Sequence, residues 1–406
     1  MITPVRYLVL GAGPSGLTLA HRLLQGGVPR DQVLVLEAAG EPGGLCRSAM
    51  VDGKPLDIGG GHFLDVRNQS VMDYVFQFMP KTEWDTYQRV AKIALRGLEI
   101  DHPLEGNLWQ LTKDDQVDYL DSIARTGSVI GKVMPENFEE WVYWKLGDKI
   151  AKDYMLPYNR KLWSMSPDRL GTYWLNKLPD VSFRDSLRSC LEQKAFGTLP
   201  AHGVFLYPKT CGYGELWKRM GMALGPSLRT NSPVTKIDVG RRIVNDLFQA
   251  ESIINTIPWT LWPRMSELPT HIVTQIHKLE HVPIDVDYCP ENLDTTAHWI
   301  YEPREEIPYH RMLVRHNFCP GSRGYWTETN SSRNAGRARC FRHRNEFAYP
   351  VNTREKPGAI ADVVAWAKTK HIVGMGRWGL WEHMNSDVAV ANGLALAQAL
   401  LSGKEA

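Results

Sequence analysis

The chain lacks three features that would mark a specialised class of protein. No apolar run approaches the ~20 residues needed to cross a bilayer, so we expect no membrane span. Neither sign of charge dominates, since the net charge is +2, and composition gives no reason to expect a nucleic-acid partner. The N-terminus has no long apolar stretch with a small-residue cleavage site, so no secretory signal is predicted. We expect a cytoplasmic protein.

Cysteine is also sparse. The six cysteines include no CxxC pair, which argues against a zinc site, and they are too few for a disulfide scaffold. We therefore expect reduced, mostly buried thiols. Internal repeats and low-complexity linkers are missing too, so the two or three domains expected for 406 residues should be interleaved rather than strung out.

The first forty residues follow the pattern of a βαβ unit. Residues 7–10 are apolar and predict a short buried strand, and residues 11–16 form a glycine-rich turn. Residues 17–25 have helical spacing, and residues 32–36 predict a second strand. Strand, turn, helix and strand in about thirty residues indicate a parallel sheet.

The turn of this unit carries a GxGxxG motif made by Gly11, Gly13 and Gly16. Gly11 permits the tight turn, Gly13 lets the backbone approach a pyrophosphate, and Gly16 lets helix and strand pack closely. The helix N-terminus presents free N–H groups to the phosphates. Glu37 follows about twenty residues later, where a carboxylate accepts hydrogen bonds from ribose hydroxyls. We predict a dinucleotide site.

Three further glycine clusters favour FAD over NAD. Gly43 and Gly44, followed by Arg47, predict a second phosphate-facing loop for a large, extended cofactor. Residues 57–62 form a glycine-rich turn that ends in a histidine. Residues 374–379 precede the last predicted helix and offer another helix N-terminus to an anion or a ring carbonyl.

With these elements in view, the sequence resembles the UDP-galactopyranose mutases and their relatives in the amine oxidase and protoporphyrinogen oxidase group of flavoproteins. The glycine motifs, Glu37 and Arg47 are similar to FAD elements shared by the whole group. Four further segments resemble the mutases in particular, and they occur in the mutase order: Pro157-Tyr158-Asn159-Arg160-Lys161-Leu162-Trp163 with Trp174-Leu175, Trp299-Ile300-Tyr301-Glu302-Pro303 with Pro308-Tyr309-His310-Arg311, Tyr349-Pro350-Val351-Asn352, and Gly376-Arg377-Trp378-Gly379 with Trp381.

The resemblance implies a set of site residues. Two are expected to act in catalysis, His62 beside the flavin and Arg311 at the diphosphate. The expected substrate-binding residues are Asn159, Trp163, Tyr301, Arg311 and Tyr349. The expected cofactor-binding residues are Gly11, Gly13, Ser15, Gly16, Glu37, Gly43, Gly44, Arg47, Gly60, Gly61, His62, Val234, Gly376, Arg377 and Asp387. No metal site is predicted.

The resemblance also implies a reaction, a redox-neutral pyranose–furanose interconversion of a nucleotide sugar. Reduced FAD (FADH2) would be the nucleophile, the substrate a UDP-hexose, and the electron source an external reductant such as NAD(P)H. Two other functions stay open: a flavin oxidase or dehydrogenase acting on an amine or a porphyrin-like molecule, and a mutase relative using another nucleotide sugar. A third is a flavoprotein that binds a nucleotide sugar without converting it.

The chain departs from the mutase pattern at the second arginine that grips the diphosphate. The places where relatives carry it hold Ser164-Met165 and Lys177-Leu178, and His383 stands where a tyrosine is common. A locally basic run has two interpretations, a solvated loop or the source of a replacement arginine. Its members are Arg333, Arg337, Arg339, Arg342 and Arg344.

The expected fold is α/β, a Rossmann-like FAD-binding domain with a helical insertion and a second antiparallel sheet. Amphipathic, aromatic stretches between residues 76 and 200 predict a mainly helical substrate domain. Alternating segments predict an antiparallel-sheet substrate region over residues 263–345. The FAD-binding domain would then be discontinuous, comprising residues 1–75, 201–262 and 346–406.

Overall fold

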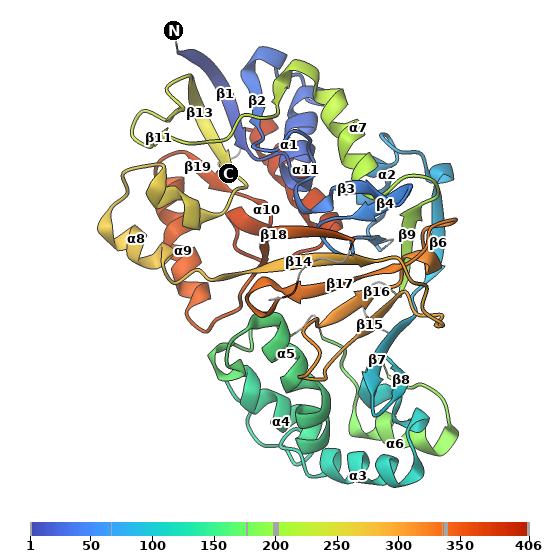
Figure 1. Cartoon of the computed structure of the whole chain (residues 1–406). Coiled ribbons are helices and arrows are strands. Elements are labelled where there is room, and N and C mark those ends of the chain that lie inside the picture. Colours follow the sequence, from blue (N-terminus) through green and yellow to red (C-terminus); the bar gives the residue numbers. More distant parts are fainter. Residues whose placement is uncertain are drawn as a thin grey trace.

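The computed structural model describes residues 2–65, 67–175, 178–197, 203–334, 336 and 340–403. Three layers of structure follow one another in Figure 1. A sheet flanked by helices, which holds both ends of the chain, lies at the top. A second sheet crosses the middle, and a group of helices lies at the bottom.

The first sheet is the expected Rossmann-like core. Its strands in spatial order are β10 (Leu228–Arg229), β2 (Val33–Leu36), β1 (Thr3–Leu10), β13 (Phe248–Asn255), β12 (Ile243–Val244) and β11 (Ile237–Asp238), with β19 (Ile372–Gly374) also paired to β13. Strands β10, β2, β1, β13 and β19 are parallel. Leu8, Val9 and Leu10 are fully buried, because helices cover both faces of a parallel sheet.

The covering helices position the turn that follows β1. Helix α1 (Pro14–Gln25) packs against α11 (Ser386–Leu401) and α7 (Gly214–Leu224) on one face. On the other face, α8 (Thr270–Ile276) packs against α9 (Lys356–Lys368). The predicted strand–helix–strand order at the N-terminus and the predicted C-terminal helix are confirmed. The carboxyl end of β1 therefore meets the N-terminus of α1, the place where such sheets bind ligands.

The second sheet runs in the order β18, β14, β17, β16, β15, β7 and β8. The bounds of these strands are β18 (Phe341–Pro350), β14 (His281–Cys289), β17 (Tyr325–Asn330), β16 (Arg311–Leu313), β15 (Trp299–Tyr301), β7 (Ala91–Leu95) and β8 (Leu98–Asp101). All neighbours are antiparallel except β15 and β7, which are parallel. Strand β18 continues past residue 345, the domain boundary expected from the sequence.

Residues 76–200 differ from the expected helical segment in their first third. Strand β6 (Trp84–Gln88) and strands β7 and β8 lie there, and the latter two extend the second sheet. Ala91, Ile93 and Leu95 are buried while the residues between them are partly exposed. This period of two is the pattern of a strand with one covered face, and the longer amphipathic stretches downstream conceal it.

The rest of this segment forms the helical group. It contains α3 (Lys113–Ala124), α4 (Phe138–Ile150), a π-helical turn (Ala151–Met155), α5 (Leu156–Trp163) and α6 (Phe183–Glu192). The fully buried Lys161 joins α5 to the second sheet, because its Nζ donates to the carbonyl oxygens of Glu302 at 2.7 Å and Arg304 at 2.8 Å. Helix α5 therefore has a fixed position beside β15.

Smaller elements complete the described chain. They are the hairpin of β3 (Ser48–Val51) and β4 (Lys54–Asp57), a sheet of β5 (Leu64–Asp65), β9 (Val204–Pro208) and β6, and the helices α2 (Gln69–Val75) and α10 (Gly376–Gly379). All six cysteines lie in the described ranges and are free thiols. Among the described helices, none is both long enough and apolar enough to cross a membrane.

A hydrogen bond of His298 beside the second sheet makes the stability of the fold depend on pH. Its Nδ1 accepts a hydrogen bond from the Val90 N–H at 3.0 Å, so the ring is neutral there. Burial lowers the pKa of His298 from about 6.5 to about 4. As pH falls below 6.5, His298 is protonated in the unfolded chain but stays neutral in the folded chain. The free energy of unfolding therefore decreases with falling pH.

We expect this group to remove roughly 2 kcal/mol of unfolding free energy between pH 7 and pH 5. The measurement is urea unfolding of the wild type and of His298→Asn, whose amide oxygen can accept the same bond without titrating. The variant should lose correspondingly less stability over this range. Parallel losses in the two proteins would contradict the assignment.

Candidate functional site

The turn between β1 and α1 contains three motif glycines. The fold itself requires two of them, and the third leaves open space. Gly11 has φ +102°, and a Cβ there would lie 2.6 Å from Thr256 Oγ1. A Cβ on Gly16 would lie 2.3 Å from the Gly11 carbonyl oxygen. At Gly13, by contrast, a Cβ would meet no atom within 4 Å. The turn thus keeps open space in front of Gly13, where a phosphate group fits.

Glu37 and the second glycine loop hold this turn in place. The Glu37 carboxylate accepts the Ala12 N–H at 2.8 Å and the Ala39 N–H at 2.9 Å. The Gly43 N–H donates to the Ala12 carbonyl oxygen at 2.8 Å. Gly44 lies against Gly13, since a Cβ on Gly44 would be 3.4 Å from the Gly13 Cα. Two loops distant in sequence therefore form one backbone cradle.

The cradle opens into a cavity of about 430 Å³, which we call the glycine-loop cavity. Eight of the predicted cofactor-binding residues line it: Gly11, Gly13, Ser15, Glu37, Gly44, Arg47, His62 and Arg377. The other predicted residues lie around it or farther off. Gly376 contacts Ser15, and Asp387 follows the lining residue Ser386 in α11. Val234 belongs to the buried apolar core beside β2 and is not among the lining residues described.

His62 ends the predicted glycine turn and is neutral. Its Nδ1 donates to the Gly60 carbonyl oxygen at 3.1 Å. Burial, and next the nearby Arg377 guanidinium, lower the pKa of His62 to about 3. The imidazole therefore carries no charge at neutral pH. It can donate or accept a hydrogen bond in the cavity but cannot act there as a cation.

Arg377 closes the same side of the cavity. Its guanidinium donates to the carbonyl oxygens of Ala348 and Met384, each at 2.7 Å, and lies 5.6 Å from the centre of the Tyr349 ring. These bonds fix the chain around α10 against β18. Arg377 thus shapes the cavity and adds positive charge to its wall.

A second cavity, of about 270 Å³, lies between the second sheet and the helical group. We call it the aromatic cavity because Trp141, Tyr154, Tyr158, Trp163, Trp174 and Tyr301 line it. Four of the five predicted substrate-binding residues line this cavity: Asn159, Trp163, Tyr301 and Arg311. The fifth, Tyr349, lies next to it, with its ring centre 5.0 Å from that of the lining residue His383.

Asn159 and Trp163 form a pair on α5. Asn159 Nδ2 donates to the Met155 carbonyl oxygen at 2.8 Å, and Asn159 Oδ1 accepts the Trp163 indole N–H at 3.0 Å. Helical spacing of four residues makes both contacts possible. The pair leaves the second Nδ2 proton and the second Oδ1 acceptor position of Asn159, together with the indole ring of Trp163, for a ligand.

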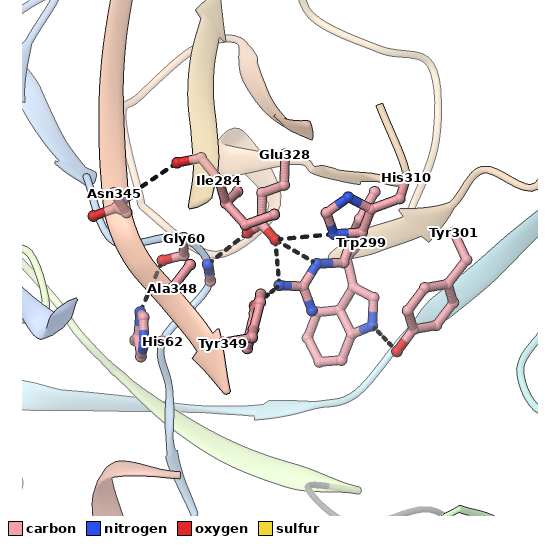
Figure 2. Close-up of polar contacts among 12 residues, drawn as sticks. Gly60, His62, Ile284, Trp299, Tyr301, His310, Glu328, Asn345, Ala348 and Tyr349 are labelled. Atoms are coloured by element: carbon pink, nitrogen blue, oxygen red, sulfur yellow. Dashed lines mark hydrogen bonds and ion pairs between the residues drawn. The ribbon is translucent and has the colours of Figure 1, made fainter. Parts of the chain in front are cut away.

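Arg311, which lines the aromatic cavity, forms an ion pair with the buried Glu328. The Glu328 Oε2 accepts from Arg311 Nε at 3.0 Å and from Arg311 Nη2. The Glu328 Oε1 accepts the Gly61 N–H at 2.9 Å. Figure 2 shows the Glu328 side chain pointing into the group formed by Gly60, His310 and Tyr349. The Tyr349 hydroxyl accepts from Arg311 Nη2 at 3.4 Å.

Sequence reasoning missed Glu328, which connects the two predicted catalytic regions. The available signal was a carboxylate inside a strand whose other residues are almost all buried. A buried charge needs a partner, and an unpaired one costs several kcal/mol. Searching for that partner would have led to Arg311. Sequence reasoning also missed Tyr158 and Glu105, which line the aromatic cavity.

The basic run does not supply a second arginine to the aromatic cavity in the described part of the chain. Arg342 pairs with Asp287 at 2.6 Å and Arg344 with Glu346 at 3.1 Å. Neither these two nor Arg333 are among the residues that line that cavity. Arg337, Arg339 and Lys177 lie outside the described residues.

Comparisons with known proteins agree with this architecture. Residues 9–78 match the family model of the NAD(P)-binding Rossmann-like domain. The structure is similar to that of a reduced UDP-galactopyranose mutase, with a TM-score of 0.88 and 23% identity over 99% of this chain and 96% of that chain. It is also similar to a protein from Exiguobacterium sp. 255-15 provisionally assigned as a protoporphyrinogen oxidase (TM-score 0.72, 15% identity, 100% of both chains).

A further similar structure is wild-type putrescine oxidase bound to putrescine, with a TM-score of 0.63 and 15% identity over 99% of this chain and 100% of that chain. At these identities the likeness concerns the fold. The chain therefore has, over nearly its whole length, the fold that UDP-galactopyranose mutase shares with these oxidases, built on a Rossmann-like dinucleotide-binding domain.

Proposed function

We propose that the protein is an FAD-dependent mutase that interconverts the pyranose and furanose forms of a nucleotide-linked hexose, with a UDP-hexose as the first substrate to test. One observation carries the proposal. The Arg311 guanidinium lines the aromatic cavity, and the carboxylate that binds it also accepts the N–H of Gly61, the neighbour of His62 in the wall of the glycine-loop cavity. This arrangement supports a diphosphate-binding role for Arg311 close to the proposed position of the flavin ring.

The residues of the glycine-loop cavity fit FAD. The open space at Gly13 and the N-terminus of α1 suit the pyrophosphate. Glu37, Arg47 and His62 line the same cavity, and Gly61 beside His62 donates to Glu328, the partner of Arg311, so we place the flavin ring on this side. When bound in its reduced form, FAD supplies a nucleophile for the anomeric carbon of a sugar.

Arg311 would bind the diphosphate that leaves the anomeric carbon. Glu328 accepts from Nε and Nη2, and the Tyr349 hydroxyl accepts from Nη2, so the two protons of Nη1 remain for phosphate oxygens. The Glu328 charge keeps the pKa of Arg311 well above its usual range, so the cation persists at any working pH. A positioned cation of this kind stabilises charge that develops on a leaving phosphate.

Neighbouring phenols would complete the diphosphate site. Burial raises the pKa of Tyr158 and of Tyr349, so both keep their O–H protons at neutral pH. Tyr301 lies on the other side, where its hydroxyl accepts the Trp299 indole N–H at 3.1 Å. A neutral hydroxyl donates a hydrogen bond to phosphate oxygen without adding charge. The surrounding aromatic rings exclude water from the bond that breaks.

The test is anaerobic incubation of the protein, reduced with dithionite or NAD(P)H, with a panel of nucleoside diphosphate hexoses, followed by chromatographic analysis of products. The proposal expects a furanose isomer from at least one of them and no net consumption of reductant. Absence of any isomer with fully reduced, folded protein would refute it. A product only from a sugar other than a UDP-hexose would identify a mutase of different specificity.

A second candidate is an oxidase acting on an amine or a porphyrin-like substrate, which the fold likeness to putrescine oxidase favours. Such an enzyme reduces oxygen during each turnover and releases hydrogen peroxide. Peroxide formation that depends on an added amine or porphyrinogen would favour this function. The Arg311 guanidinium argues against an amine substrate, because a cationic substrate gains nothing from a guanidinium.

A further inference from the structure

Trp381 has a backbone conformation that tryptophan rarely adopts. Its φ is +50°, in the left-handed region that residues other than glycine avoid, and the residue is fully buried. Nine other described residues with side chains have a positive φ, and each of them is polar and at least partly exposed. Backbone strain in a buried residue persists only where its surroundings enforce it, and such residues cluster at functional sites.

The strained backbone lies in the turn that ends α10. The Glu382 N–H donates to the Arg377 carbonyl oxygen at 2.8 Å, which closes a Schellman motif around Leu380 and Trp381. Trp381 occupies the position of this motif that glycine normally holds. Glycine would adopt the same backbone without strain, so the turn itself does not need an indole ring. The reason for a tryptophan lies in what its side chain contacts.

The indole connects this turn to the second sheet. Its Nε1–H donates to the Glu280 carbonyl oxygen at 3.1 Å, and the Val351 N–H donates to the same oxygen at 2.9 Å. Glu280 directly precedes β14, and Val351 directly follows β18, two residues after Tyr349. The indole therefore anchors the turn beside the strand end that carries Tyr349, a predicted substrate-binding residue.

The segment around Trp381 contributes to both cavities. Residues before and after it line the glycine-loop cavity: Arg377, Trp378, Met384 and Ser386. His383, two residues after Trp381, lines the aromatic cavity, with its ring centre 5.0 Å from that of Tyr349. The hydrogen bond from the Arg377 guanidinium to the Met384 carbonyl oxygen closes the segment into a loop. One short loop, anchored by one indole, therefore forms part of the wall of each cavity.

We propose that Trp381 is a positioning residue that holds the walls of the two cavities in a fixed relation to each other. The inference rests on the proposed function, in which a flavin in the first cavity reacts with a sugar in the second. Trp381 is not among the residues that line either cavity, so neither ligand depends on the indole for its own binding. A displacement of about 1 Å between reacting groups costs about 100-fold in rate. Loss of the indole should therefore lower turnover far more than binding.

The test replaces Trp381 with phenylalanine, which keeps an aromatic ring but cannot donate to Glu280. With the reduced holoprotein and a nucleoside diphosphate hexose that the wild type converts, kcat of Trp381→Phe should fall roughly 10- to 100-fold. The variant should keep its FAD through gel filtration, and the Kd of UDP for the oxidised holoprotein should stay within about three-fold of the wild-type value. Saturating UDP should change the absorption spectrum of the oxidised flavin less in the variant, because the shared wall is no longer fixed.

The matched control is Trp84→Phe. Trp84 is also a buried tryptophan whose indole N–H donates to a carbonyl oxygen, that of Met79 at 3.0 Å, and it is not among the residues that line either cavity. This control should keep the kcat and the spectral response of the wild type. Trp381→Tyr, whose hydroxyl supplies a donor at the edge of the ring, should recover part of the lost kcat, and it carries the comparison if the phenylalanine variant does not fold.

Wild-type kcat and spectral response in Trp381→Phe would overturn the inference. An equal loss of turnover in Trp84→Phe, or a parallel loss of FAD and melting temperature in Trp381→Phe, would overturn it as well, because the indole would then act on stability alone. In each of these cases, conversion of the sugar by the wild type leaves the proposed function standing. A wild type that converts no nucleoside diphosphate hexose would remove the proposed function, and the spectral response to UDP would still test Trp381.

Discussion

Arg311→Lys is expected to lower kcat/KM about 100-fold in the mutase assay while leaving FAD bound. Lysine keeps the charge that Glu328 needs, so the buried carboxylate stays paired and the fold survives. It loses the planar fork that binds phosphate oxygens in pairs, and removal of one such contact costs roughly 100- to 1000-fold in rate. Steady-state kinetics with reduced protein gives the number.

The matched control is Arg304→Lys, the same replacement in another arginine–glutamate pair. Arg304 pairs with the buried Glu302 but is half exposed and lies outside both cavities. Its activity should stay within about two-fold of the wild type, as for most surface ion pairs. Equal losses in the two variants would mean that Arg311 acts through stability alone. Arg311→Ala is less informative, because it strands the Glu328 charge at a cost of about 3–5 kcal/mol.

Gly13→Val should abolish flavin binding without disturbing the fold. Gly13 has φ −76° and ψ 178°, which a valine adopts readily, and a Cβ there meets no protein atom within 4 Å. The added methyl groups would instead occupy the space for the pyrophosphate. Loss of two charge-assisted hydrogen bonds, about 1.5–3 kcal/mol each, weakens FAD binding by roughly 100-fold or more. We expect a colourless purified protein.

Gly358→Val provides the comparison, because a Cβ at Gly358 also meets nothing within 4 Å and the residue lies in α9, away from the cavities. This variant should be yellow. Circular dichroism and the melting temperature of the flavin-free proteins should agree for the two variants. A yellow Gly13→Val protein with normal flavin affinity would contradict the placement of the cofactor.

The sequence predicts the first part of the molecule well because its signals are local. One βαβ unit contains both the turn of Gly11, Gly13 and Gly16 and the acid Glu37. Within such a unit, the separation of two residues in the sequence determines their separation in the structure. The sites on α5 and β15 depended on the resemblance, since aromatic residues such as Trp163 are far more often core than ligand contacts.

The parts that escaped prediction depend on contacts between distant segments. Glu328 and Gly61 are 267 residues apart, and nothing near either one indicates the hydrogen bond between them. Strand β7 joins the second sheet by pairing with β15, more than 200 residues later. Val234 belongs to the apolar core beside β2, and its contact with the cofactor stays a prediction.

The bond from Glu328 to Gly61 has a consequence for how the two halves of the site respond to each other. One rigid carboxylate binds the Gly61 N–H through one oxygen and the Arg311 guanidinium through the other. A displacement of either group therefore moves the carboxylate and changes its hydrogen bond to the other group. A ligand that binds Arg311 then shifts the conformational equilibrium of the Gly60–Gly61 peptide. Because coupling free energies are reciprocal, a change in the conformation of that peptide alters the affinity for the ligand by the same free energy. Occupancy on one side and backbone state on the other form a single linked equilibrium.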